Sequence, residues 1–122
     1  MEVTYVEGVV SGIDGMKTSV RFLVDGGATY SLLPSESWRA IGLEPKRTAV
    51  FTLADGTKLE RRVSECFISL SGCEGAEGEA HTPVLLGEPN DEALLGGVTL
   101  EILGLVLNPF TRKLQPMRML LA

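Results

Sequence analysis

The sequence reads FLVDGGATYSLL from Phe22 to Leu33, and the prediction of the fold starts from these twelve residues. Its apolar start, Phe22 to Val24, is typical of a strand buried on both faces. The chain then places a carboxylate, Asp25, directly before two glycines. An unpaired buried carboxylate is costly, so we expect Asp25 to be satisfied by backbone N–H groups or used in chemistry. Since Leu32 and Leu33 resume a strand, the acid is predicted to lie at a turn between two core segments.

The segment Leu23 to Ala28 resembles the apolar-apolar-Asp-Thr/Ser-Gly-Ala signature of the aspartic proteases. It departs from that signature at Gly26, where the family carries Thr or Ser. The resemblance implies that Asp25 is catalytic and that Gly26, Gly27 and Ala28 form the supporting turn.

Length and composition restrict the class of protein further. A chain of 122 residues is predicted to form one domain, residues 1–122, and 14 glycines with 6 prolines suit the many turns of an all-β fold. The net charge of −5 and the lack of a Lys/Arg stripe argue against a nucleic-acid partner. We find no apolar run of membrane-spanning length and no basic leader, so we expect a cytoplasmic protein without a membrane partner.

Cysteine and histidine are too few for most other chemistries. Cys66, Cys73 and His81 fall short of a four-ligand metal site, so no metal or other cofactor is expected. The two cysteines are either free thiols or a hairpin disulfide. A lone His81 in a loop context also argues against Cys/His and Ser/His/Asp catalysis.

A hairpin is predicted around Ala54-Asp55-Gly56-Thr57, because Asp-Gly turns join antiparallel strands. In the retroviral-type proteases that the chain resembles, a hairpin in this region is the flap that closes over the substrate. The alternative is an ordinary surface hairpin. A short helix is expected over residues 35–42, capped by Ser35 and with Trp38 and Ile41 buried. Other strands are expected over residues 2–10, 16–24, 48–53, 58–63, 65–70, 82–86, 105–107 and 114–121.

A second landmark of the family is an apolar-apolar-Gly segment ahead of a short helix, and Leu94-Leu95-Gly96 matches it. The resemblance spans Val20 to Pro109. It implies a closed, retropepsin-like acid-protease barrel with one or two short helices and one lobe per chain. It also implies that a peptide would lie nearest to Ala28, Tyr30, the flap residues and the Leu94–Gly96 segment.

Peptide hydrolysis by aspartates needs two carboxylates that share one proton. Asp14, Asp55 and Asp91 lie in turn contexts, so the second carboxylate is expected from another copy of the chain. The predicted assembly is a homodimer that binds a peptide or protein substrate. Residues 1–6 and 117–121 either interleave between the subunits or pair within one chain.

The predicted function is therefore that of an aspartic endopeptidase. In the family that the chain resembles, the Thr or Ser hydroxyl braces the two catalytic turns, so the resemblance implies that Gly26, which has no hydroxyl, weakens the activity. One alternative is a non-catalytic relative that binds peptides in the same cleft. The other is an unrelated small β-barrel, in which Asp25 is a capped turn acid.

Overall fold

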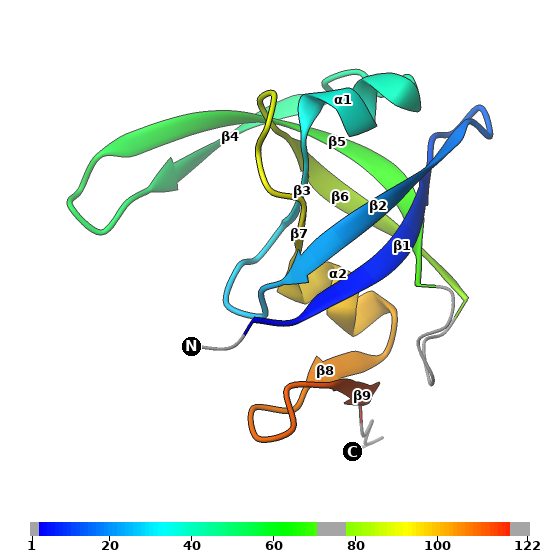
Figure 1. The fold of residues 1–122 in the computed structure, drawn as a ribbon. Helices are drawn as coiled ribbons and strands as arrows, with labels where there is room; N and C mark the ends of the chain where they lie inside the picture. The colour runs from blue at the N-terminus through cyan, green and yellow to red at the C-terminus, as the bar shows by residue number, and fades with distance from the viewer. Residues whose placement is uncertain (1–2, 71–77, 118–122) are drawn as a thin grey trace, which may run out of the picture.

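The structure is a computed structural model that describes residues 3–70 and 78–117. In these two ranges the chain is mostly β, with two short helices (Figure 1). The elements are β1 (Tyr5–Ser11), β2 (Lys17–Val24), β3 (Ser31–Leu33), α1 (Ser35–Ala40), β4 (Arg47–Thr52), β5 (Lys58–Ser69), β6 (Glu79–Leu86), β7 (Leu94–Leu95), α2 (Gly97–Ile102), β8 (Leu105–Leu107) and β9 (Leu114–Pro116).

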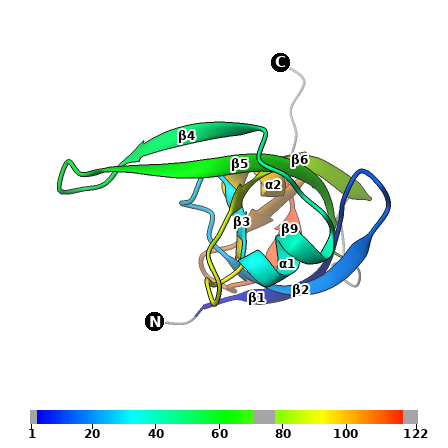
Figure 2. The same ribbon diagram turned by 90° about the horizontal axis from the view of Figure 1, so that it is seen from above.

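Seven strands form one sheet in the order β1-β2-β7-β3-β6-β5-β4. The far end of β5 also pairs with β1, so the sheet closes on itself into a barrel (Figures 1 and 2). Closure leaves β4 outside the ring, where it pairs with β5 alone. The predicted closed all-β barrel with two short helices is confirmed.

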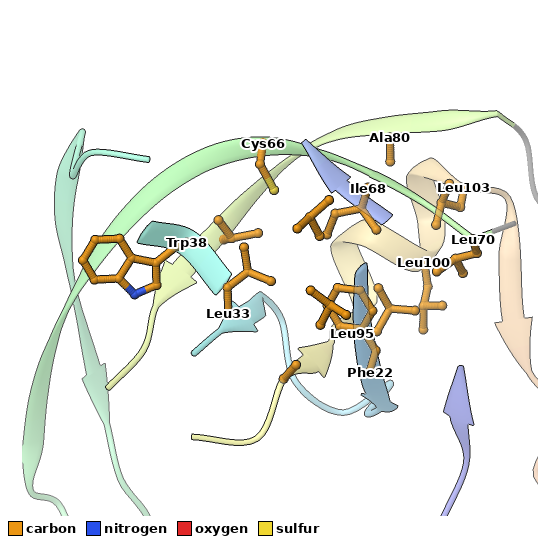
Figure 3. Close-up of a cluster of buried hydrophobic side chains, with 14 of the residues drawn as sticks. Phe22, Leu33, Trp38, Cys66, Ile68, Leu70, Ala80, Leu95, Leu100 and Leu103 are labelled. Atoms are coloured by element: carbon orange, nitrogen blue, oxygen red, sulfur yellow. The ribbon is translucent and has the colours of Figure 1, made fainter. Parts of the chain in front are cut away.

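The core fills the inside of this barrel (Figure 3). Phe22, Leu33 and Leu95 are fully buried there, and they come from β2, β3 and β7. Each large apolar side chain removed from water in this way stabilises the fold by about 1.5–3 kcal/mol. The apolar segments on either side of Asp25 are thus anchored in the core, and they hold the turn between them.

Helix α1 closes one end of the core. Trp38 and Ile41 are buried as predicted, and the Trp38 indole N–H donates to the Gly87 carbonyl at 2.9 Å. The predicted Ser35 cap is wrong. Pro34 holds the N-cap position without a side-chain hydrogen bond, and Ser35 is the first helical residue.

The predicted division of the segment after the hairpin into two strands is wrong. The sequence predicted two strands interrupted near Ser64, but Lys58–Ser69 is one continuous strand. Ser64 does not break it, because its hydroxyl is buried and donates to the Glu44 carbonyl at 2.7 Å. Strand β6 likewise starts at Glu79, three residues before the predicted start.

Both ends of the described chain pair within the chain itself. Tyr5 and Val6 face Leu23 and Phe22 of β2, and β9 pairs antiparallel with β8. Residues 1–2, 71–77 and 118–122 lie outside the described residues, so the interleaving of the outermost residues stays a prediction. No described helix has the length and apolar character needed to cross a membrane.

Candidate active site

The Asp25 turn lies where β2 ends and is fixed by backbone hydrogen bonds on both sides. The Asp25 N–H donates to the Leu95 carbonyl at 3.0 Å, and the Asp25 carbonyl accepts from the Ala28 N–H at 3.1 Å. The half-buried carboxylate accepts a further hydrogen bond from the Gly27 N–H to Oδ1, also at 3.1 Å. The predicted fold-back of glycine N–H groups onto the acid is confirmed for Gly27.

Strand β7 and helix α2 lie against the Asp25 turn and hold it in place. A Cβ added at Gly96 would lie 2.5 Å from the backbone carbon and oxygen of Tyr30, so only glycine fits there. The next residue, Gly97, donates its N–H to the Ala28 carbonyl at 2.7 Å. The Leu94-Leu95-Gly96 segment therefore lies directly beside the Asp25 turn.

Three buried hydroxyl groups link α2 to β3 and β6, and none of them was predicted from the sequence. The Thr99 hydroxyl of α2 lies 2.6 Å from the Ser31 hydroxyl of β3 and 2.9 Å from the Thr82 hydroxyl of β6. Ser31 Oγ also accepts the Gly96 N–H at 2.9 Å. The only sequence signal for this cluster is that β3, β6 and α2 each contain a single residue with a hydroxyl group.

The surface next to the turn is open. Gly26 is exposed, and a Cβ added there would meet nothing within 4 Å. A hollow of about 220 Å³ adjoins it, formed by the turn and the start of α2. Its lining residues are Gly26, Gly27, Ala28, Thr29, Gly97, Val98 and Glu101.

The predicted hairpin between β4 and β5 is present and extends away from the barrel body (Figures 1 and 2). At its tip the Thr57 N–H donates to Asp55 Oδ1 at 2.9 Å, and Gly56 adopts a left-handed φ of 88°. The hydrogen bond from Thr57 lowers the pKa of the exposed Asp55 carboxyl. Ala54, Asp55, Gly56 and Thr57 are all exposed, and their role as a flap stays a prediction.

Tyr30 connects strand β4 of this hairpin to the segment that follows Asp25. Its ring meets Phe51 edge-on, with centroids 6.1 Å apart, and Arg47 Nη2 donates to its hydroxyl at 3.3 Å. Both partners lie on β4 and were not predicted. Their spacing of four residues along a strand, which places them on one face, is the signal that could have found them.

The two leucines of the β7 segment differ in exposure. Leu94 is half-buried and pairs with Leu23 and Leu32 of the neighbouring strands. Leu95 is fully buried among the core side chains (Figure 3). Leu94 is therefore the member of the pair that lies nearer the surface.

Cys66 and His81 lie on β5 and β6, away from the Asp25 turn in the chain topology. Cys66 is a free, buried thiol whose pKa burial raises to about 12. The expected loop position of His81 is wrong, because His81 lies within β6 opposite Phe67 of β5. Its ring stacks on that of Phe67 at 4.7 Å and lies 3.9 Å from Glu65. Within residues 3–70 and 78–117, no group of three or more His, Cys, Asp or Glu side chains is arranged to hold a metal ion.

The barrel, the Asp25 turn and the supporting α2 together define a retropepsin-like fold. Residues 11–101 match a family model described as "gag-polyprotein putative aspartyl protease", and the chain belongs to this family. Among solved structures it is similar to EIAV protease complexed with the inhibitor HBY-793, with a TM-score of 0.59 and 18% sequence identity. That match covers 84% of this chain and 89% of the other. None of the curated proteins searched matches the chain.

Proposed function

We propose that this protein is an aspartic endopeptidase whose active unit is a homodimer with the two Asp25 carboxylates side by side. The observation that carries the proposal is the Asp25 turn, in which a half-buried carboxylate is oriented by the Gly27 N–H and anchored to Leu95 and Ala28. Membership of a family of aspartyl proteases supports the same activity.

The need for a second copy follows from the chemistry. One carboxylate has to accept a proton from water while its partner donates one to the carbonyl oxygen of the peptide. In the part of the chain that the structure describes, Asp25 forms no hydrogen bond with another carboxylate. A twofold axis beside the exposed Gly26 would bring the two Asp25 groups together, and it would use the open surface next to the turn.

Proximity would also set the protonation state of the pair. Two carboxylates in contact cannot both be ionised, so the pair holds one proton between them over an acidic range of pH. The oxygen that keeps the proton donates to the substrate carbonyl, and the ionised oxygen takes the proton of the attacking water. We therefore expect cleavage to be favoured by acid.

The test is a fluorogenic-peptide assay at acidic pH with the wild-type protein and Asp25→Asn. The amide of Asn cannot accept the proton from water, so we expect cleavage to fall by at least about a hundredfold, the lower range for general acid–base catalysis. Asp14→Asn is the matched control, because it makes the same change in an exposed turn away from the predicted site. Unchanged cleavage by Asp25→Asn would contradict the proposal.

The same assay separates the non-catalytic alternative. A relative that only binds peptides would show no cleavage as wild type, while retaining affinity for the peptide in fluorescence anisotropy. Cleavage by the wild-type protein that pepstatin-type inhibitors abolish would exclude that alternative.

A further inference from the structure

The β4–β5 hairpin has a charge opposite to that of the rest of the chain. Residues 46–62 contain five of the eleven basic residues and two of the sixteen acidic ones, a formal charge of +3 in a chain of −5. The remaining residues carry six basic and fourteen acidic side chains. Positive charge is thus concentrated on a hairpin that extends from the barrel body (Figure 1).

The strand register shows which of these charges lie on the same face as the Tyr30 contacts. Cross-strand partners share a face of a sheet, and Tyr30 contacts both Phe51 and Arg47. We call the face that carries these two residues the inner face of the hairpin, because Tyr30 belongs to the segment that follows the Asp25 turn. Its cross-strand pairs are Arg47–Val63, Ala49–Arg61 and Phe51–Leu59.

The inner face therefore carries two guanidinium groups and no carboxylate. Arg47 donates to the Tyr30 hydroxyl, and the half-buried Arg61 donates from Nη1 to the Glu60 backbone carbonyl at 3.2 Å. In the described ranges neither side chain forms an ion pair. The acidic Glu60 lies on the opposite, outer face, together with Lys58 and Arg62.

We infer that the inner face of the hairpin selects peptides with an acidic side chain, through Arg47 and Arg61. The inference rests on the proposed function, since it assigns the substrate class of that site. A guanidinium presents forked donors that match a carboxylate, and the neighbouring apolar Ala49, Phe51 and Leu59 reduce the screening by water. The acidic remainder of the chain repels anions, so the preference is confined to the substrate position beneath the hairpin.

The first test uses matched decapeptides in which Glu or Gln is scanned through each position around the cleaved bond. At one position we expect kcat/KM to be up to about fivefold higher for Glu than for Gln, the upper end of the range measured for exposed ion pairs. Raising the salt concentration from about 20 mM to about 500 mM should reduce this ratio toward one. Equal rates for Glu and Gln at every position would overturn the inference.

Variants locate the preference on the inner face. Arg47→Gln combined with Arg61→Gln should abolish the Glu/Gln ratio in kcat/KM. Lys58→Gln is the matched control, because it removes a positive charge from the outer face of the same hairpin. Loss of the ratio in Lys58→Gln as well would assign the effect to the net charge of the hairpin, and would contradict a role for the inner face.

A binding measurement keeps this inference separate from the proposed activity. With Asp25→Asn, fluorescence anisotropy reports the affinity for the same Glu and Gln peptides in the absence of cleavage. Tighter binding of the Glu peptide that requires Arg47 and Arg61 would support the inference even if the wild-type protein cleaved nothing. Equal affinity for both peptides, or binding of neither, would overturn it whether or not the wild-type protein is a protease.

Discussion

The backbone N–H of Asp25 donates a 3.0 Å hydrogen bond to the carbonyl of Leu95, seventy positions further along the chain. Leu95 is fully buried, so this bond connects the acid directly to the rigid core. The segment around Leu95 therefore positions Asp25, and its integrity can be tested separately from the chemistry of the carboxylate.

Replacing Gly96 by Ala should disrupt the support of the Asp25 turn. The new Cβ would lie 2.5 Å from the Tyr30 backbone, and such overpacking costs about 1–3 kcal/mol. We expect a matching fall in the free energy of unfolding, measured by denaturant titration, together with a loss of cleavage. Gly26→Ala is the control, since its Cβ meets nothing within 4 Å. Equal stability of the two variants would contradict the close approach.

The Thr99 hydroxyl should be essential for the buried cluster that it forms with the Ser31 and Thr82 hydroxyls. Thr99→Val keeps the shape but leaves the Ser31 and Thr82 hydroxyls without their shared partner, which costs about 1–3 kcal/mol. Thr99→Ser retains the hydroxyl and should lose less. Thermal unfolding of both variants measures the difference, and a Val variant at least as stable as the Ser variant would argue against a stabilising network.

The features of the site that could be predicted from the sequence were local. An apolar strand followed by Asp-Gly-Gly predicts the turn at Asp25, and Asp55-Gly56 predicts the hairpin, because each pattern limits the backbone over a few residues. The Ser31–Thr99–Thr82 cluster was not predictable, since its members are far apart in the chain and buried hydroxyls resemble surface ones in sequence. The spacing of Arg47 and Phe51 could place them on one face of a strand, but their contact with Tyr30 depends on the twist and path of the hairpin.

Gly26→Thr should raise the rate of cleavage. The space beside Gly26 is open, so the larger side chain fits, and it would give each subunit a hydroxyl worth about 1 kcal/mol across the proposed dimer axis. We expect kcat to increase severalfold and the dimer to dissociate at lower concentration than wild type. Gly26→Val, which has the same shape without the hydroxyl, is the matched control. An equal gain in the Val variant would show that stiffening of the backbone, and no hydrogen bond, is responsible.

The buried Cys66 should be unreactive while the protein is folded. Its pKa is raised from 9.0 to about 12, so almost no thiolate exists near pH 8, and burial also blocks reagents. In a Cys73→Ser background, we expect an aromatic disulfide reagent to label Cys66 only after denaturation. Rapid labelling of the native protein would contradict the burial.

The same thiol should make stability depend on pH in the alkaline range. Above pH 9 the unfolded chain loses the Cys66 proton, whereas the folded protein keeps it until about pH 12. The contribution is therefore fully present below pH 9 and is lost as the pH rises toward 12. Unfolding titrations of this protein and of Cys66→Ala, compared at each pH, should converge over that interval; a constant difference would contradict the shift.

The pairing of two Asp25 groups is tested most directly by mixing subunits. Wild-type and Asp25→Asn chains are refolded together in equal amounts, and the cleavage rate is compared with that of wild type at the same total concentration. If each active site needs Asp25 from both subunits, only dimers of two wild-type chains are active, and the rate should fall to about a quarter. A rate of about one half would mean that each chain acts alone, and would contradict the proposed dimeric active site.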